Sequence, residues 1–177
     1  MRIISIDPGV MTGYCYAELV ATAPGTARAL SELEQVNKLK YHPFQAADDV
    51  DDLWRRLKRF DPEYIIIEDF EFRRGKAGAA GLNLFPKELI GVTRLYDLLT
   101  NARVFVQKAA QGKSYYTNPI LQGLGLYRRG IPHGMDASRH LLQWCMFGFG
   151  NQFIGKQRTE DFAQITQKLE WWADANE

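Results

Sequence analysis

Cysteine is scarce in this chain, and long apolar runs are missing. The two cysteines among its 177 residues, Cys15 and Cys145, lie in apolar surroundings and share no CxxC spacing. We interpret them as buried free thiols of a reducing compartment. No segment joins a basic start to an apolar stretch and a cleavage site, so we expect no secretory signal and a cytoplasmic location. No apolar run is long enough to span a bilayer, so we expect no membrane partner.

Internal repeats, low-complexity segments and linkers are also missing. The length suits one ordinary domain with a real core, and the apolar share of 46% is normal for a globular protein. We therefore expect one domain over residues 1–150, with residues 151–177 as a helical extension of it. A glycine-bearing stretch at 75–81 is interpreted as a loop within the domain.

Charge is nearly balanced overall, at +1, but unevenly distributed. Residues 1–70 carry a net charge of −4, residues 71–158 carry +9, and residues 159–177 carry −4. A basic middle between acidic flanks is compatible with a phosphate-binding face. The alternative is a solvated surface on which basic side chains happen to cluster.

The order of apolar patterns predicts an α/β fold. Three strands joined by short turns suggest an antiparallel meander, and alternating helices and strands then add two parallel strands. The result is a mixed five-stranded sheet flanked by helices, in which the first and fourth strands are parallel neighbours. In chain order we expect strands at 1–7, 12–20 and 27–39, a helix at 47–60, a strand at 65–67, a helix at 86–100, a strand at 103–107, an interrupted helical region at 115–125, and helices at 133–147 and from 159.

Acidic residues end two of the buried strands. Asp7 closes the first apolar strand, Glu68 and Asp69 follow the isoleucine run at 65–67, and His133 and Asp136 open an apolar helix. The spacing of His133 and Asp136 puts both on one helix face. We choose Glu68 over Asp69 as the inward acid because it directly continues the isoleucine run, and successive strand residues face opposite sides.

Three remote segments would thus bring hard ligands to one place, as a magnesium site requires. Like charges held close are costly without a cation, and two divalent ions about 4 Å apart would remove that cost and support phosphodiester hydrolysis. Each residue also has a structural interpretation. Asp7 could be a turn residue before Pro8–Gly9, and Glu68 could cap the next turn or pair with a lysine. Asp136 could be an acid stabilised by a helix dipole, and His133 a residue near the helix N-cap without a metal contact.

A family resemblance is carried by three segments: IISIDPGVMTGY, IIIEDFEF and HGMDASRHLLQW. They resemble the RuvC-type Holliday-junction resolvases of the ribonuclease H-like superfamily, over most of the chain up to about residue 150. The family motifs are an Asp-Pro-Gly after the first strand, a Glu ending the fourth strand, and an acid or His three residues before an Asp-Ala pair that opens the last core helix.

The resemblance implies a crossover junction endodeoxyribonuclease that acts as a homodimer on four-way and other branched DNA. It implies that Asp7, Glu68, His133 and Asp136 form the catalytic set and bind two Mg²⁺ ions, with Mn²⁺ as a substitute. Lys113 resembles the family's active-site lysine. Paired nicks would leave 5′-phosphate and 3′-hydroxyl ends. The stretch from Lys113 to His133 is shorter than in cellular bacterial members, which is typical of bacteriophage-encoded versions.

DNA-binding candidates follow Glu68. The loop there resembles the region where the family inserts an aromatic residue into the junction, and its basic side chains could hold phosphates while aromatic rings stack on unpaired bases. The alternative is that the phenylalanines are core residues and the basic residues are solvated. The candidates are Phe70, Phe72, Arg73, Arg74 and Lys76, with Arg128 and Arg129 before the catalytic helix.

Other functions remain open from the sequence. A general ribonuclease H-like nuclease would lack branch preference, and a non-catalytic module would bind branched DNA without cutting it. An Asp-x-Gly loop after the first strand is also found in the actin and sugar-kinase group, but those proteins need two such domains and this chain has room for one.

Overall fold

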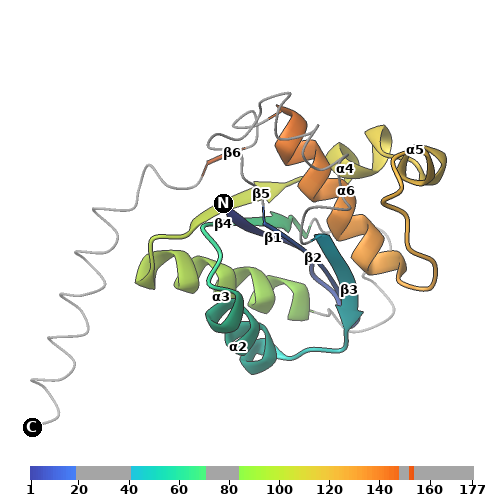
Figure 1. Ribbon diagram of the computed structural model, residues 1–177. Coiled ribbons are helices and arrows are strands. Elements are labelled where there is room, and N and C mark those ends of the chain that lie inside the picture. Colours follow the sequence, from blue (N-terminus) through green and yellow to red (C-terminus); the bar gives the residue numbers. More distant parts are fainter. Residues whose placement is uncertain (19–40, 71–83, 148–151, 154–177) are drawn as a thin grey trace, which may run out of the picture.

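The computed structural model describes residues 1–18, 41–70, 84–147 and 152–153, and its centre is one mixed sheet (Figure 1). The strand order is β3-β2-β1-β4-β5-β6. The strands are β1 (Arg2–Asp7), β2 (Thr12–Glu18), β3 (Tyr41–Ala46), β4 (Tyr64–Glu68), β5 (Arg103–Gln107) and β6 (Gln152–Phe153). The helices are α2 (Val50–Phe60), α3 (Phe85–Leu99), α4 (Ala109–Tyr115), α5 (Asn118–Gly123) and α6 (Pro132–Phe147).

The predicted mixed sheet, with a three-stranded antiparallel meander and two further parallel strands, is confirmed, although its third strand lies later in the chain than predicted. The strands β1, β2 and β3 form the antiparallel meander, and β1, β4 and β5 run parallel to one another. The predicted neighbours β1 and β4 pair in parallel, with Ile6 opposite Ile67. The two-residue strand β6 adds an antiparallel edge beside β5, which the sequence did not predict.

Two helical layers cover the two faces of the sheet (Figure 1). On one face lie α2 and α3, and their apolar residues form a cluster with Ile4, Ile6 and Ile65. On the other face lie α4, α5 and α6, and their cluster takes Ile3 and Ile66 from the same strands. Because strand side chains alternate in direction, each strand supplies both cores. None of the helices in the described part of the chain has the length and apolar character to cross a membrane.

Helix α2 carries Asp51 and Asp52 in its first turn and Lys58 and Arg59 in its last, an order that suits the helix dipole. The Asp49 side chain accepts a hydrogen bond from the backbone N–H of Asp52, which completes a capping box.

Two predicted elements differ from the structure. The third strand of the meander is β3 at Tyr41–Ala46, and the predicted strand at 27–39 lies outside the described residues. The helical region predicted at 115–125 is two short helices that begin earlier, at Ala109. Pro119 lies in the first turn of α5, where a missing N–H costs nothing, so it starts a helix here and does not interrupt one. The predicted helix from 159 also lies outside the described residues.

Helix α6 approaches the meander closely because two glycines lack side chains at the contact. A Cβ on Gly13 of β2 would lie 2.0 Å from the carbonyl oxygen of His133. A Cβ on Gly134 of α6 would lie 2.6 Å from the carbonyl oxygen of Phe44 in β3. These contacts bring the start of α6, with His133, against the end of the sheet at which β1 finishes.

Substitution of Gly13 tests this contact. Gly13→Ala is expected to lower the free energy of unfolding by about 1–3 kcal/mol, because α6 must shift to admit the methyl group. Gly91→Ala, at an exposed position of α3 where an added Cβ meets no described atom within 4 Å, is expected to raise it by about 0.5–1 kcal/mol. Urea denaturation of both variants measures the difference. Equal stability of the two would show that the close contact does not constrain α6.

Candidate active site

The carboxyl ends of three parallel strands place polar side chains on one face of the sheet. Asp7 ends β1, Glu68 ends β4 and Gln107 ends β5, and Glu68 pairs with Gln107 in register. Ile3 and Ile66 face α6, so alternation turns Asp7 and Glu68 to that same face. Asp7, Glu68 and Gln107 therefore form a polar row that we call the acidic edge.

Asp69 belongs to the opposite face. Its carboxylate accepts a hydrogen bond from the Lys87 ammonium of α3 at 3.1 Å, and both side chains are partly exposed. Glu68 instead contacts α4 and α6. The structure thus places Glu68, and not Asp69, beside Asp7.

Helix α6 supplies the opposing side of the acidic edge. His133 Nδ1 lies 3.0 Å from Asp7 Oδ2, and His140 Nε2 lies 2.8 Å from Glu68 Oε2. The fully buried His140 ring also contacts Gln107 Oε1 through Nδ1, at 2.7 Å. Both histidines and Asp136 lie on the helix face turned toward the sheet, since positions three, four and seven apart share one face.

Two basic side chains hold Asp136. Lys113 Nζ of α4 lies 3.1 Å from Asp136 Oδ2 and 3.4 Å from Glu68 Oε2, so its ammonium joins two carboxylates. The guanidinium of Arg139 pairs with the other oxygen of Asp136 and donates through Nε to the carbonyl of Tyr116 at 2.7 Å. The four predicted residues Asp7, Glu68, His133 and Asp136 and the predicted Lys113 are therefore brought together.

Burial and neighbouring charge shift the pKa values in this cluster. Burial, followed by the charge of Glu68, raises the pKa of Asp7 to about 6, although the hydrogen bond with His133 acts in the opposite direction. Burial acts to raise the pKa of Glu68 too, but His140 and Lys113 together lower it below its ordinary value. Burial opposes the charge of Lys113, yet the nearby Glu68 and Asp136 raise its pKa. Asp7 is thus the carboxylate whose charge is least compensated.

Three contributors escaped the sequence analysis: His140, Gln107 and Arg139. His140 lies four residues after Asp136 and seven after His133, so helical spacing alone could have indicated it. Gln107 ends a predicted strand next to one that ends in Glu68, which was also visible in the sequence. Arg139 lies three residues after Asp136, a spacing at which an Asp and an Arg of one helix can pair, so this ion pair could also have been predicted.

The donor set suits a hard divalent cation in its chemistry. Asp7, Glu68 and Asp136 offer carboxylate oxygens, the ligands that Mg²⁺ prefers. Burial and then the charge of Glu68 raise the pKa of Asp7, so a nearby cation would stabilise its charged form. As arranged, no group of three His, Cys, Asp or Glu residues in the described ranges encloses a metal position. Lys113 instead lies between Glu68 and Asp136.

The DNA-binding candidates lie in different settings. Phe70 is half-buried and packs against the cluster beneath α2 and α3. Arg128 and Arg129 are exposed on the loop before α6, and the Arg128 guanidinium donates to the carbonyls of Gly125 and Tyr127 at 3.1 and 3.2 Å. Phe72, Arg73, Arg74 and Lys76 lie outside the described residues.

Replacement of Asp7 should stabilise the fold. The folded state holds the Asp7 proton more tightly than the unfolded chain, so the wild-type protein loses stability, relative to Asp7→Asn, as the pH rises from about 4 to about 6. Above pH 6 and without divalent metal, Asp7→Asn is expected to raise the free energy of unfolding by about 1–3 kcal/mol. Chemical denaturation at pH 4 and pH 7.5 measures the effect. A loss of stability at pH 7.5 would contradict the electrostatic account.

Comparison with solved structures finds this architecture elsewhere. RuvC of Thermus thermophilus superimposes with a TM-score of 0.53 and 19% sequence identity, over 81% of this chain and 92% of that one. A structure of T. thermophilus RuvC in complex with Holliday junction substrate gives 0.54 and 19%, over 81% and 91%. The superposition with the yeast mitochondrial Holliday junction resolvase Ydc2 is weaker, with a TM-score of 0.48 and 13% identity over 82% of this chain and 78% of that one.

Sequence comparison adds nothing to this likeness, since neither a family model nor a curated protein matches the chain. At this level of identity the likeness concerns the fold. The sheet order, the helical layers and the superposition agree with the predicted architecture. The chain therefore has the ribonuclease H-like fold of the RuvC-type Holliday junction resolvases.

Proposed function

We propose that this protein is a metal-dependent endodeoxyribonuclease that resolves four-way DNA junctions by paired nicking. The observation that carries the proposal is the convergence of Asp7, Glu68 and Asp136 at the carboxyl end of the sheet, with Lys113 among them. The fold supports it, because T. thermophilus RuvC has this fold and has been solved with a Holliday junction substrate.

The carboxylates would hold the metal. Asp7, Glu68 and Asp136 would supply the carboxylate ligands of two ions, and His133, whose Nδ1 lies 3.0 Å from Asp7 Oδ2, would complete the ligand set or orient the attacking water. Two Mg²⁺ ions, when bound, would polarise the phosphodiester and lower the pKa of an attacking water. Mn²⁺ is expected to substitute, because a histidine is a softer ligand than a carboxylate.

The chain's own residues have separate tasks in this proposal. Lys113 would turn its ammonium from Glu68 and Asp136 to the phosphate, whose negative charge grows as the bond breaks. His133, whose side chain is 45% exposed and bonded to Asp7, would orient that carboxylate or the attacking water. His140 is buried and fixes the position of Glu68. Cleavage would leave 5′-phosphate and 3′-hydroxyl ends.

A four-way junction has two strands to cut, so two active sites related by a twofold axis would suit it. The exposed apolar side chains of α3 offer a surface for a second copy of this chain. Leu95 and Leu99 lie one turn apart and are 48% and 59% exposed. A homodimer through this face would leave both acidic edges open, because the acidic edge contacts α4 and α6, which lie on the other side of the sheet.

Adjacent acids at the end of β4 provide a matched test of the nuclease. Glu68→Gln is expected to reduce cleavage of a labelled four-way junction in Mg²⁺ by more than about 100-fold, because a metal-binding carboxylate is lost. Asp69→Asn, one residue away on the opposite face, should cut within about twofold of the wild-type protein, because its partner is the exposed Lys87. The measurement is the single-turnover nicking rate on the junction, on linear duplex and on RNA:DNA hybrid.

Each result assigns a function. Paired nicks on the junction that need metal and Glu68 would establish the resolvase. Equal cutting of duplex or hybrid would indicate a general nuclease. Binding of the junction without cutting by the wild-type protein, in Mg²⁺ and in Mn²⁺, would overturn the nuclease proposal and leave a branch-binding module.

Thermal unfolding adds an independent readout, since Mg²⁺ should raise the unfolding temperature of the wild-type protein more than that of Asp7→Asn.

The dimer is tested by charge on α3. Leu95→Glu combined with Leu99→Glu is expected to convert the dimer to a monomer, because two buried carboxylates would face one another across the twofold. Ile120→Glu, which also alters an exposed apolar residue but on α5, should leave the mass unchanged. Sedimentation velocity measures the mass of each. A monomeric wild-type protein at micromolar concentration would contradict the proposal.

A further inference from the structure

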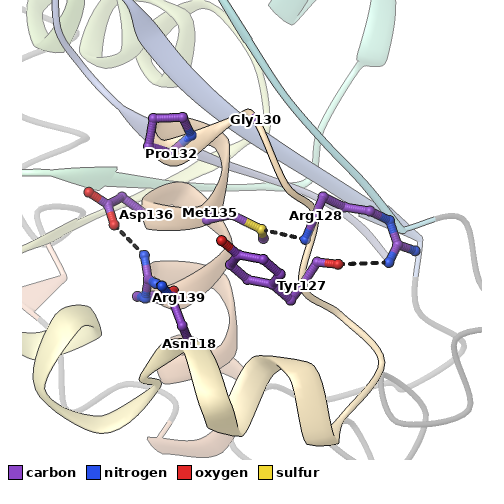
Figure 2. Close-up of a pocket in the computed structure, with 8 residues that line it drawn as sticks. All are labelled: Asn118, Tyr127, Arg128, Gly130, Pro132, Met135, Asp136 and Arg139. Carbon is purple, nitrogen blue, oxygen red and sulfur yellow. Dashed lines mark hydrogen bonds and ion pairs between the residues drawn. The ribbon is translucent and has the colours of Figure 1, made fainter.

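A small pocket adjoins the acidic edge between α5 and α6. It has a volume of about 160 Å³ and is lined by residues of both helices and of the loop between them. Figure 2 shows Tyr127 projecting from that loop toward Arg139 and Asp136, with Asn118 of α5 on the far side. The pocket is smaller than the roughly 300–1,000 Å³ of sites for drug-sized ligands, so it has room for one compact group.

Asp136 connects this pocket to the acidic edge. One carboxylate oxygen of Asp136 pairs with Arg139, which lines the pocket, and the other accepts from Lys113 at 3.1 Å beside Glu68. If a DNA phosphate lies at the acidic edge, the base of the adjacent nucleotide would therefore be within reach of the pocket.

The walls are held in place before any ligand arrives. The Arg139 side chain is 12% exposed, and its guanidinium is bonded to Asp136, to Asn118 Oδ1 and to the carbonyl of Tyr116. The loop is tied down by the backbone N–H of Tyr127, which donates to the Leu121 carbonyl at 3.1 Å. A pocket that is already ordered loses little entropy on binding.

The charge inside the pocket disfavours an anion. Asp136 neutralises Arg139, and its own carboxylate lines the wall, so a phosphate would meet a negative charge there. The Arg128 guanidinium turns away from the pocket, back to its own loop, as Figure 2 shows. The exposed Arg128 and Arg129 would suit backbone phosphates outside it.

We propose that this pocket receives one unpaired nucleobase of the strand that is cut, next to the cleaved phosphate. The proposal rests on the nuclease function proposed above. The Tyr127 ring and the flat guanidinium of Arg139 would stack on the base, and the Asn118 amide would hydrogen-bond to its edge. An unpaired base at a branch point is the least costly to turn out of the stack, so the pocket would give the enzyme a base preference beside the cut.

Cleavage of junctions that differ only in the base on either side of the cut tests this pocket. The wild-type protein is expected to cut the junction with the preferred base at least about tenfold faster than the junction with the least favoured base. The reason is that the Asn118 amide cannot form its hydrogen bond when the wrong base occupies the pocket. Asn118→Leu and Tyr127→Leu should each reduce that preference to about twofold or less. The Leu at 127 keeps apolar bulk against the core, and Asn118 is exposed, so neither change should unfold the protein. Tyr115→Leu, at an exposed tyrosine outside the pocket, should keep the full preference.

A binding experiment separates this inference from the nuclease. Asp7→Asn is mixed with junctions that carry 2-aminopurine beside the cut position, and fluorescence reports whether that base leaves the stack. Asn118→Leu, Tyr127→Leu and Tyr115→Leu are each added to Asp7→Asn. A fluorescence change that the first two abolish and the third retains would support the pocket, even if the wild-type protein did not cut. Cutting with no base preference and no fluorescence change would overturn the pocket and leave the nuclease intact. Failure to bind branched DNA at all would overturn both.

Discussion

The parallel pairing of β1 with β4 is the interaction on which the site depends. It places Ile6 opposite Ile67, so the next residue of each strand, Asp7 and Glu68, leaves the sheet at the same edge. Side-chain alternation then turns both acids toward α6. The isoleucines before them are fully buried between the two helical layers, and a slip of one residue would turn this apolar set and the acids to the wrong faces.

The acidic edge is an electrostatic compromise. Asp7 remains poorly compensated, with a pKa raised to about 6, whereas Glu68 and Asp136 are paired with Lys113, His140 and Arg139. Natural proteins tolerate such costs where function requires them, and the buried apolar clusters on both faces of the sheet supply the stability that offsets them. The same helix that delivers Asp136 also carries the residues that hold it, so the geometry of the edge depends on how α6 docks.

Docking of α6 in turn depends on two positions without side chains. Gly13 and Gly134 let the helix backbone approach the meander, which brings His133 to 3.0 Å from Asp7 across 126 residues of sequence. The pocket between α5 and α6 is a by-product of the same arrangement, because Arg139 lies on the side of α6 that faces α5. Helix α6 would thus carry Asp136 at the acidic edge and, through Arg139, one wall of the base pocket.

The sequence by itself determined the strands and the helix that carry the acidic residues, although not the third strand or the bounds of the two short helices before α6. The isoleucine run before Glu68, the Asp-Pro-Gly after the first strand, and the apolar spacing after His133 predicted where the carboxylates would lie along the chain and which strands would be neighbours. Only the tertiary structure decided which partners those carboxylates have: that Lys113 joins Glu68 to Asp136, that the buried His140 joins Glu68 to Gln107, and that the third strand is Tyr41–Ala46. The physical reason is that local pattern sets the period and length of an element, whereas contacts across 33 to 126 residues depend on register and on how closely helices pack against the sheet.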